Sequence, residues 1–229
     1  MAPVKPAVDQ LPGIDYRFSE PVLLDEALTH RSLATRNNER LEFLGDAILN
    51  FVIAARLYDR RPDDNEGSLS RLRSRVVRGE TLARVARRLA LSDHLRMGES
   101  ELKSGGFLRD SVLADTLEAV LGAVYLDGGF VAAENVILTL FHDEIEGLPD
   151  AEDLKDPKTR LQEWLQARAF PLPVYELVAE EGAEHAKRFT VRCRLVEPAF
   201  EAEATGTSRR KAEQAAAQQV LAAQESTAP

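Results

Sequence analysis

Residues 112–126 read VLADTLEAVLGAVYL, and this stretch decides how the first half of the chain is interpreted. Apart from Thr116, its only polar side chains are Asp115 and Glu118. A helix that is apolar all round is normally buried, and ionised carboxylates are unfavourable there unless their charge is compensated. Because these acids are three residues apart, they project from the same side. The stretch predicts a buried helix whose acidic pair needs a partner.

A second apolar run repeats the pattern. Residues 39–55, ERLEFLGDAILNFVIAA, place Glu39, Glu42 and Asp46 at positions i, i+3 and i+7. At about 100° per residue these acids lie within roughly 60° of one another on one face, and Asn50 extends that face by one turn. The ordinary alternative is that the acids are solvated or paired with a cation such as Arg40.

The functional alternative brings the acids of both helices to one place. Without cations they would repel one another, and oxygen ligands with few His or Cys residues nearby suit Mg²⁺. Water activated by such a cation attacks phosphorus in line. The pattern is therefore typical of a phosphodiesterase.

The remainder of the first half is also predicted to be helical. Ser19 and Ser111 are candidate N-caps, and Gly128 and Gly129 are candidate terminators. The expected helices are Glu20 to Thr29, Glu39 to Arg60, Leu69 to Val77, Glu80 to Leu89, Val112 to Leu126 and Val131 to Glu146.

The second half has a different pattern. Residues 147–157, GLPDAEDLKDP, are polar and contain two prolines, which favours a linker. We predict a mainly α domain over 1–147, a linker over 148–155, and a small α+β domain of order α-β-β-β-α over 156–226. Its expected elements are a helix from Pro157 to Arg168, strands Val174 to Ala179, Phe189 to Val196 and Phe200 to Ala204, and a helix from Arg209 to Gln224. In the middle strand Val191, Cys193 and Leu195 alternate with outward-facing residues.

Composition limits the class of protein. The chain has one cysteine, Cys193, no apolar leader, and no run of about 18 apolar residues. These features predict a cytoplasmic protein without a membrane partner. The net charge of −9 and the pI of about 5.1 argue, taken alone, against a nucleic-acid partner. A carboxylate-rich metal site would account for part of that charge, and local basic clusters matter more than the total.

Four blocks occur in order along the first half: ALTHRS at 27–32, NERLEFLGDA at 38–47, EGSLSRLRS at 66–74 and SGGFLRDSVLADTLEAVLGAVYLD at 104–127. Together they resemble the ribonuclease III family, whose members are Mg²⁺-dependent endonucleases that cut double-stranded RNA, with Mn²⁺ as a substitute. The resemblance implies the ribonuclease III endonuclease fold and a homodimer that cuts both strands, leaving 5′-phosphates and short 3′ overhangs.

The resemblance also implies residue roles. It assigns metal binding to Glu42, Asp46, Asp115 and Glu118, and catalysis to Asp46 and Glu118. Glu39 and Glu66 match acids that help to place RNA and water. Phe43 matches an aromatic that inserts into a pocket of the partner subunit, although the sequence alone would favour an ordinary core residue.

The second half resembles a double-stranded-RNA-binding domain, which reads RNA shape, 2′-hydroxyls and phosphates. The resemblance implies RNA contacts on the first helix, in the loop 182–189 and at the start of the last helix. The implied contact residues are Thr159, Gln162, Glu163, Gln166, His185, Ser208, Arg209, Arg210 and Lys211. Three cations at a helix N-terminus oppose the helix dipole, and a phosphate partner removes that conflict.

The chain departs from the family pattern in two places, the loop after Gly182 and position 204. The usual Gly-Pro that begins the loop is Gly182-Ala183, followed by Glu184, and the usual glycine two positions before Gly206 is Ala204. Both changes bear on the RNA contacts rather than on the domain.

The resemblance thus implies an endoribonuclease that processes precursors of ribosomal RNA, and some messenger and transfer RNA. Three alternatives remain open. A protein that only binds double-stranded RNA would gain nothing from buried acids, and a helical scaffold that dimerises would need no metal. A metal enzyme acting on small phosphate esters would not need the RNA-binding half.

Overall fold

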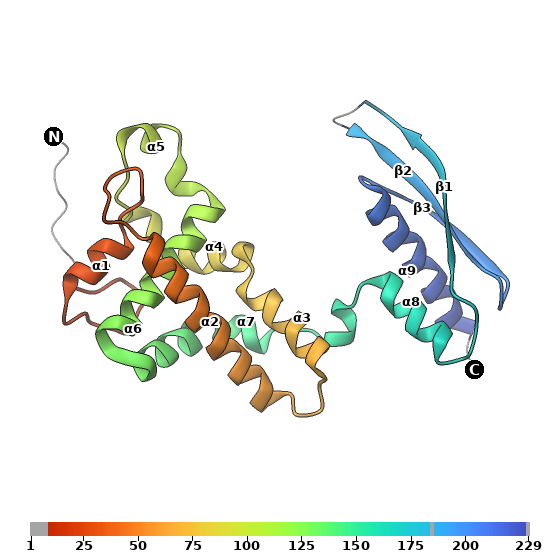
Figure 1. The fold of residues 1–229 in the computed structure, drawn as a ribbon, viewed down its shortest axis with the longest axis horizontal. Coiled ribbons are helices and arrows are strands. Elements are labelled where there is room, and N and C mark those ends of the chain that lie inside the picture. The colour runs from red at the N-terminus through yellow and green to blue at the C-terminus, as the bar shows by residue number, and fades with distance from the viewer. Residues whose placement is uncertain (1–8, 184–185, 228–229) are drawn as a thin grey trace. The chain divides into compact units, whose positions relative to one another are not determined.

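The structure is a computed structural model that describes residues 9–183 and 186–227 (Figure 1). The chain forms two compact units, which divide between Ala151 and Glu152. Residues 152–155, inside the predicted linker, thus belong to the second unit, where the Lys155 ammonium pairs with Glu152 and Glu163.

The first unit is helical, as predicted. Its described elements are α1 (Pro21–Ala27), α2 (Glu39–Arg60), α3 (Glu66–Val77), α4 (Gly79–Arg88), η1 (Leu91–Asp93), α5 (Glu99–Lys103), η2 (Gly106–Leu108), α6 (Asp110–Leu140) and α7 (His142–Glu146). Helix α6 is the central element, packing against α1, α2 and α4. Among the described residues, it alone is long and apolar enough by composition to cross a membrane, but here it forms the core of this unit.

Neither predicted N-cap is formed. The Ser19 side chain does not cap α1. Instead, the Asp127 carboxylate accepts hydrogen bonds from the backbone N–H groups of Ser19 and Glu20, each at 2.8 Å. Helix α6 begins at Asp110, so Ser111 already lies inside it. At α1 a long-range contact has thus replaced the local cap that the sequence suggested, whereas α6 simply starts earlier than expected.

The helix end predicted at the glycine pair is present, because two helices meet at a non-helical Gly129 inside the element labelled α6. Gly129 adopts φ 76° and ψ −175°, a conformation that suits glycine, and the helix resumes to Leu140. The segment predicted as one helix from Val131 to Glu146 is divided at Phe141 into the end of α6 and the short α7.

The second unit has the predicted α-β-β-β-α order. It comprises η3 (Ala151–Leu154), which spans the division, then α8 (Pro157–Gln166), β1 (Val174–Glu181), β2 (Arg188–Leu195), β3 (Phe200–Gly206) and α9 (Arg209–Thr227). The strands form an antiparallel sheet in the order β1-β2-β3.

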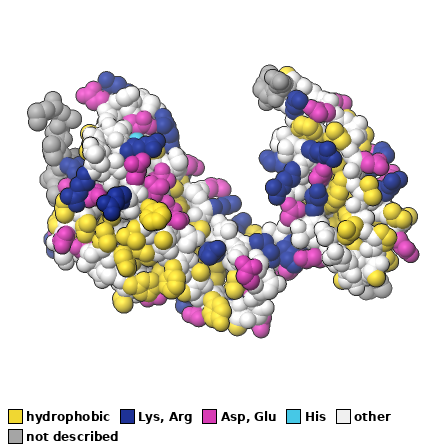
Figure 2. Space-filling view, in the orientation of Figure 1, with side chains coloured by type: hydrophobic (Ala, Val, Ile, Leu, Met, Phe, Trp, Pro, Cys, Tyr) yellow, Lys and Arg dark blue, Asp and Glu magenta, His cyan; other side chains and the backbone are white. Residues whose placement is uncertain are grey.

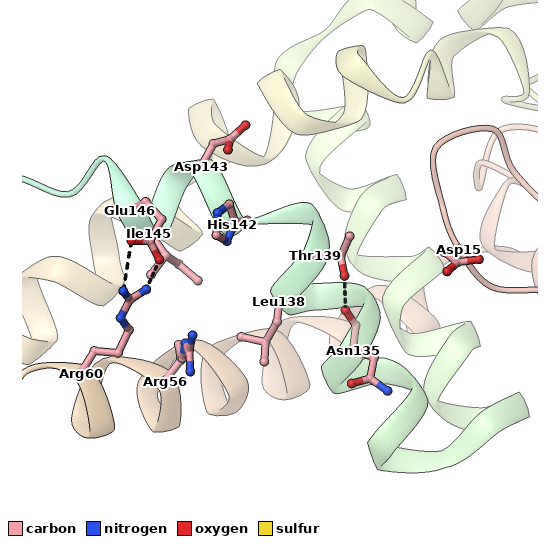
Figure 3. Close-up of a pocket in the computed structure, with 10 residues that line it drawn as sticks. All are labelled: Asp15, Arg56, Arg60, Asn135, Leu138, Thr139, His142, Asp143, Ile145 and Glu146. Atoms are coloured by element: carbon pink, nitrogen blue, oxygen red, sulfur yellow. Dashed lines mark hydrogen bonds and ion pairs between the residues drawn. The ribbon is translucent and has the colours of Figure 1, made fainter.

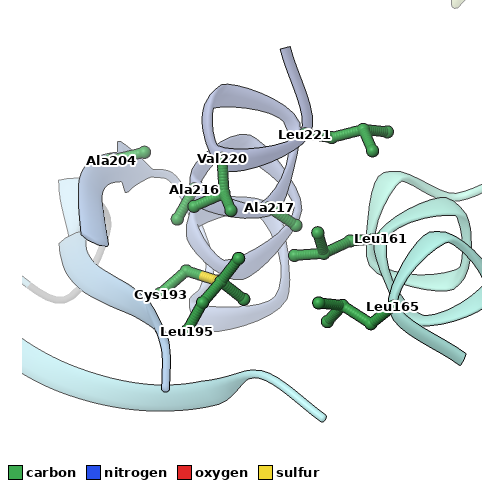
Figure 4. Packing of buried hydrophobic residues seen from close by; sticks show 9 residues of the cluster. All are labelled: Leu161, Leu165, Cys193, Leu195, Ala204, Ala216, Ala217, Val220 and Leu221. Atoms are coloured by element: carbon green, nitrogen blue, oxygen red, sulfur yellow. The ribbon is translucent and has the colours of Figure 1, made fainter. Parts of the chain in front are cut away.

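The core of the second unit lies between the sheet and its two helices (Figure 4). Val191, Cys193 and Leu195 are buried, which confirms the alternation predicted for the middle strand. Ala204, where the family pattern has glycine, is 8% exposed and belongs to this core, so its methyl group fits. Gly206 allows close approach instead, since a Cβ there would lie 2.5 Å from the Ala212 nitrogen.

Candidate active site

Helices α2 and α6 touch through glycine. A Cβ on Gly45 would lie 1.8 Å from the Glu118 carbonyl oxygen, and one on Gly122 would lie 2.3 Å from the Leu41 carbonyl oxygen. No larger residue fits at either point without separating the helices. The reciprocal contact sets the distance between the two acid-bearing helices.

This contact brings acids of both helices together. Carboxylate oxygens of Glu42, Asp115 and Glu118 all lie within 4.8 Å of one another, and each side chain is partly buried. The three side chains offer only oxygen ligands, which fits a hard divalent cation such as Mg²⁺ or Mn²⁺. We call these three residues the acid cluster.

Without a cation, the carboxyl groups of the acid cluster have raised pKa values. Burial, followed by the charges of Asp46, Asp115 and Glu42, raises the pKa of Glu118 to about 8. Burial also raises the pKa of Glu42 and of Asp115. The cluster therefore favours a positive charge, either a proton or a metal ion.

Asp46 lies at the edge of the acid cluster. Its side chain is exposed, and the Asn50 amide donates hydrogen bonds to its Oδ1 at 2.8 Å and to its backbone oxygen at 3.0 Å. Asn50 thus orients this carboxylate, and the charge of Asp46 still raises the pKa of Glu118 and Glu42.

Glu39 shares a hollow with the acid cluster, whereas Glu66 does not. Glu39, Glu42 and Asp115 line one hollow of about 530 Å³. Glu66 lines another, of about 630 Å³, and accepts a hydrogen bond from Ser70. Within a single chain, therefore, Glu66 is separate from the other predicted acids.

A larger hollow lies away from the acid cluster, so volume alone would not identify the candidate active site. A hollow of about 760 Å³ lies between the C-terminal half of α2, the end of α6 and α7, where Arg60 pairs with Glu146 (Figure 3). None of the predicted acids lines it. The chemistry of the side chains, not the volume, identifies the site.

An apolar surface covers the exposed side of α2. Phe43 is 79% exposed, which excludes the core position that the sequence alone favoured, and Phe51 and Tyr58 are 60% and 73% exposed. Hydrophobic side chains gather on this face of the first unit (Figure 2). Phe51, Tyr58 and Glu66 all line the hollow of about 630 Å³.

The predicted RNA contacts of α8 share one face. Thr159, Gln162, Glu163 and Gln166 are all exposed, while Leu161 and Leu165 of the same helix are buried. Their spacing of three and four residues accounts for the common face. His185 falls outside the described residues.

At the start of α9 two of the three cations, Arg209 and Arg210, have carboxylate partners within the chain. Arg209 donates to Glu213 at 3.0 Å, and Arg210 lies 3.7 Å from Asp156. Lys211 has no carboxylate within 4.0 Å among the described residues, and its backbone N–H donates to the Ser208 hydroxyl. The carboxylates of Glu213 and Asp156 therefore offset part of the unfavourable interaction between the arginines and the helix dipole, without a phosphate.

Known proteins resemble both units. Residues 20–145 match the family described as Ribonuclease-III-like, and residues 157–223 match the double-stranded RNA binding motif. Ribonuclease 3 of Alkalilimnicola ehrlichii is 56% identical over 208 residues, covering 91% of each chain. Ribonuclease 3 of Nitrosococcus oceani is 55% identical over 211 residues, also covering 91% of each.

A solved structure resembles the first unit. The nuclease domain of ribonuclease III from Campylobacter jejuni matches with a TM-score of 0.56 and 41% identity, covering 57% of this chain and 92% of that one. The chain belongs to the ribonuclease III family. It is an endoribonuclease whose C-terminal unit is a double-stranded-RNA-binding domain, and the family implies a divalent metal.

The roles of Gly45, Gly122 and Arg31 are not visible in the sequence alone. The glycines lie within apolar runs, where nothing in a single sequence says that another backbone approaches. Arg31 lies in the quoted ALTHRS block, but only the structure places it at the hollow of the acid cluster.

Proposed function

We propose that the chain hydrolyses double-stranded RNA with Mg²⁺, for which Mn²⁺ substitutes, held by Glu42, Asp46, Asp115 and Glu118. The observation that carries this proposal is the convergence of three carboxylates from α2 and α6 within 4.8 Å. A helical core gains nothing from this arrangement unless a cation compensates it.

The residues of the chain have separate tasks. When bound, the divalent cation polarises the phosphodiester and activates the attacking water. Glu118, whose raised pKa favours the protonated form near neutral pH in the absence of a cation, would give up that proton to serve as one of the ligands. Asp46, oriented by Asn50, faces the reacting groups, and Glu39 acts from the wall of the hollow that Glu42 and Asp115 line.

The acids form a complete site in a homodimer. The Campylobacter structure is described as flexible in a region involved in dimer formation of its nuclease domain. In this chain Phe43 projects from α2, and the hollow of about 630 Å³ lined by Phe51 and Tyr58 is apolar enough to accept it. Insertion there would bring the partner's α2 acids to Glu66, which lines the same hollow.

The second unit holds the duplex. The exposed face of α8 supplies Thr159, Gln162, Glu163 and Gln166, and Ser208, Arg209, Arg210 and Lys211 stand at a helix start, where phosphate is favoured. His185 would contact RNA from the loop. Both strands are cut to leave 5′-phosphates and short 3′ overhangs, in cytoplasmic precursors of ribosomal RNA and some messenger and transfer RNA. We assign cleavage to a domain over 1–147 and RNA binding to a domain over 156–226, with 148–155 between them; residues 152–155 of that segment belong to the second compact unit.

Cleavage of a labelled RNA duplex tests the function. The native chain with Mg²⁺ should cut both strands, whereas Glu118→Gln should bind the duplex and cut at least a thousandfold more slowly. Glu134→Gln is the matched control, because Glu134 is an acid on α6 beyond the break at Gly129 and outside the acid cluster. A native chain that binds RNA but never cuts it, with Mg²⁺ or Mn²⁺, would show that the protein only binds RNA.

A further inference from the structure

The hollow beside the acid cluster has a basic wall as well as an acidic one. Glu39, Glu42 and Asp115 line it together with Arg31 and Arg109. Arg31 comes from the loop between α1 and α2, and Arg109 directly precedes α6. A phosphodiester entering this hollow would meet the two arginines as well as the acids.

The backbone around Arg31 is held in place. Residues Thr29 and Arg96 form a parallel bridge, and the His30 N–H donates to the Arg96 carbonyl at 2.9 Å. The Gly98 N–H donates to the Ser32 hydroxyl at 3.0 Å, and a Cβ on Gly98 would lie 2.6 Å from the Ser32 carbonyl oxygen. Arg31 therefore extends from a fixed backbone on both sides.

The side chain of Arg31 is available, whereas that of Arg109 is engaged. The Arg31 side chain is 70% exposed, and its ion pair with Glu39 spans 3.3 Å. Arg109 donates to Glu101 at 2.7 Å and to Ser104 at 3.1 Å. Burial raises the pKa of Glu42 and of Asp115, and the charge of Arg31, with that of His30 at Asp115, offsets part of the rise, which agrees with the position of Arg31 in the same hollow.

We propose that Arg31 binds a non-bridging phosphate oxygen of the RNA strand that enters the acid cluster, and so positions that strand for cleavage. The inference rests on the proposed function of the cluster. A guanidinium presents paired N–H donors that match the oxygens of a phosphate, and an exposed ion pair such as that with Glu39 is weak enough to exchange. Arg31 is a positioning residue, since the acids and the cation perform the chemistry.

Two kinds of measurement test the role of Arg31. Duplex binding is measured in the Glu118→Gln background, where the RNA stays intact, over a range of salt concentrations. Arg31→Ala should reduce the slope of log affinity against log salt by about one, the contribution of one phosphate contact. In the native background Arg31→Ala should lower kcat/KM by about tenfold, and Arg31→Lys should recover part of that loss.

Arg36→Ala is the matched control. Arg36 lies in the same loop, pairs with Glu26, and does not line the hollow. The substitution Arg36→Ala removes the same charge as Arg31→Ala. Because Arg36 lies outside the hollow, the variant should keep the salt slope and kcat/KM near the native values. If Arg31→Ala and Arg36→Ala behave alike in both measurements, the proposal is overturned.

A purely structural role for Arg31 would act through Glu39. If Arg31 only supports Glu39, Arg31→Ala should have no further effect once Glu39 is replaced by Gln. If Arg31 binds phosphate, Arg31→Ala should still reduce the slope of log affinity against log salt by about one. No added change would therefore also overturn the proposal. A native chain that binds without cutting would instead refute the proposed function, and the binding measurements would still test Arg31.

Discussion

Glu118 shows at the scale of a residue how the site depends on charge. It lies on α6 among buried neighbours and faces Glu42, Asp115 and Asp46. Its raised pKa means that the folded chain binds a proton there that the unfolded chain releases. The same carboxylate is a strong cation ligand once that proton leaves.

The pH dependence of stability follows from this difference. In EDTA, stability contributed at Glu118 is fully present below its ordinary pKa of 4.5 and is lost as pH rises toward about 8. The loss should be about 1–3 kcal/mol, given the partial exposure of the site. Urea unfolding of the native chain and of Glu118→Gln between pH 5 and 8 measures it.

Two results would support this account of the cluster. The variant should lose less stability across the range than the native chain, and Mg²⁺ should stabilise the native chain most at pH 8. Parallel curves for the two proteins would contradict the raised pKa.

The contact between α2 and α6 matters at the scale of elements. Apolar periodicity accounts for the burial of each helix, but Gly45 and Gly122 decide how closely the two approach. Since Glu118 contributes its carbonyl oxygen to the contact with Gly45, the packing and the metal site share residues. A change in helix spacing must therefore change the distances among the carboxylates.

Gly45→Ala tests this coupling. The added methyl would meet the Glu118 backbone oxygen at 1.8 Å, which neither side-chain rotation nor a small shift relieves. We expect a loss of about 3 kcal/mol in unfolding free energy, at the upper end for overpacking, together with weaker Mg²⁺ binding by calorimetry. Gly79→Ala is the control, because a Cβ there meets nothing within 4 Å. Native stability and Mg²⁺ affinity in Gly45→Ala would refute the packing argument.

At the scale of the whole molecule, the position of Glu66 and the apolar surface of α2 both favour the proposed homodimer. One chain holds the acid cluster and Glu66 in separate hollows, and exposes Phe43 to solvent. A second copy would bury the aromatic and join the two groups of acids. Dimerisation is thus proposed to complete the site as well as to stabilise the chain.

Phe43→Ala should separate these effects. We expect sedimentation to show a shift from dimer to monomer and cleavage to fall at least a hundredfold, while circular dichroism stays that of a folded helical protein. Val22→Ala, at a position 48% exposed on α1, should leave both unchanged. A dimeric and fully active Phe43→Ala would exclude Phe43 as the anchor of the interface.

Patterns within single elements were readable from the sequence. Acids at helical spacing in apolar runs predicted the two buried helices, and alternation predicted the middle strand, because both depend on repeats of a few residues. The four sequence blocks indicated the ribonuclease III family, and the family resemblance indicated the order of the two domains. Helix ends were less accurate. Ser19 does not cap α1, because the Asp127 carboxylate on α6 accepts from the backbone at that end, and Ser111 does not cap α6, because that helix already begins at Asp110.

Relations between elements were decided only by the tertiary structure. The glycine contact between α2 and α6 decides which acids converge. The carboxylates of Glu213 and Asp156, which pair with Arg209 and Arg210, decide which cations at the start of α9 are free to bind phosphate. Arg31 faces the acid cluster because its loop is joined to the segment around Gly98. A sequence on its own specifies local periodicity and chemical type, whereas distances between distant segments arise only when backbones pack.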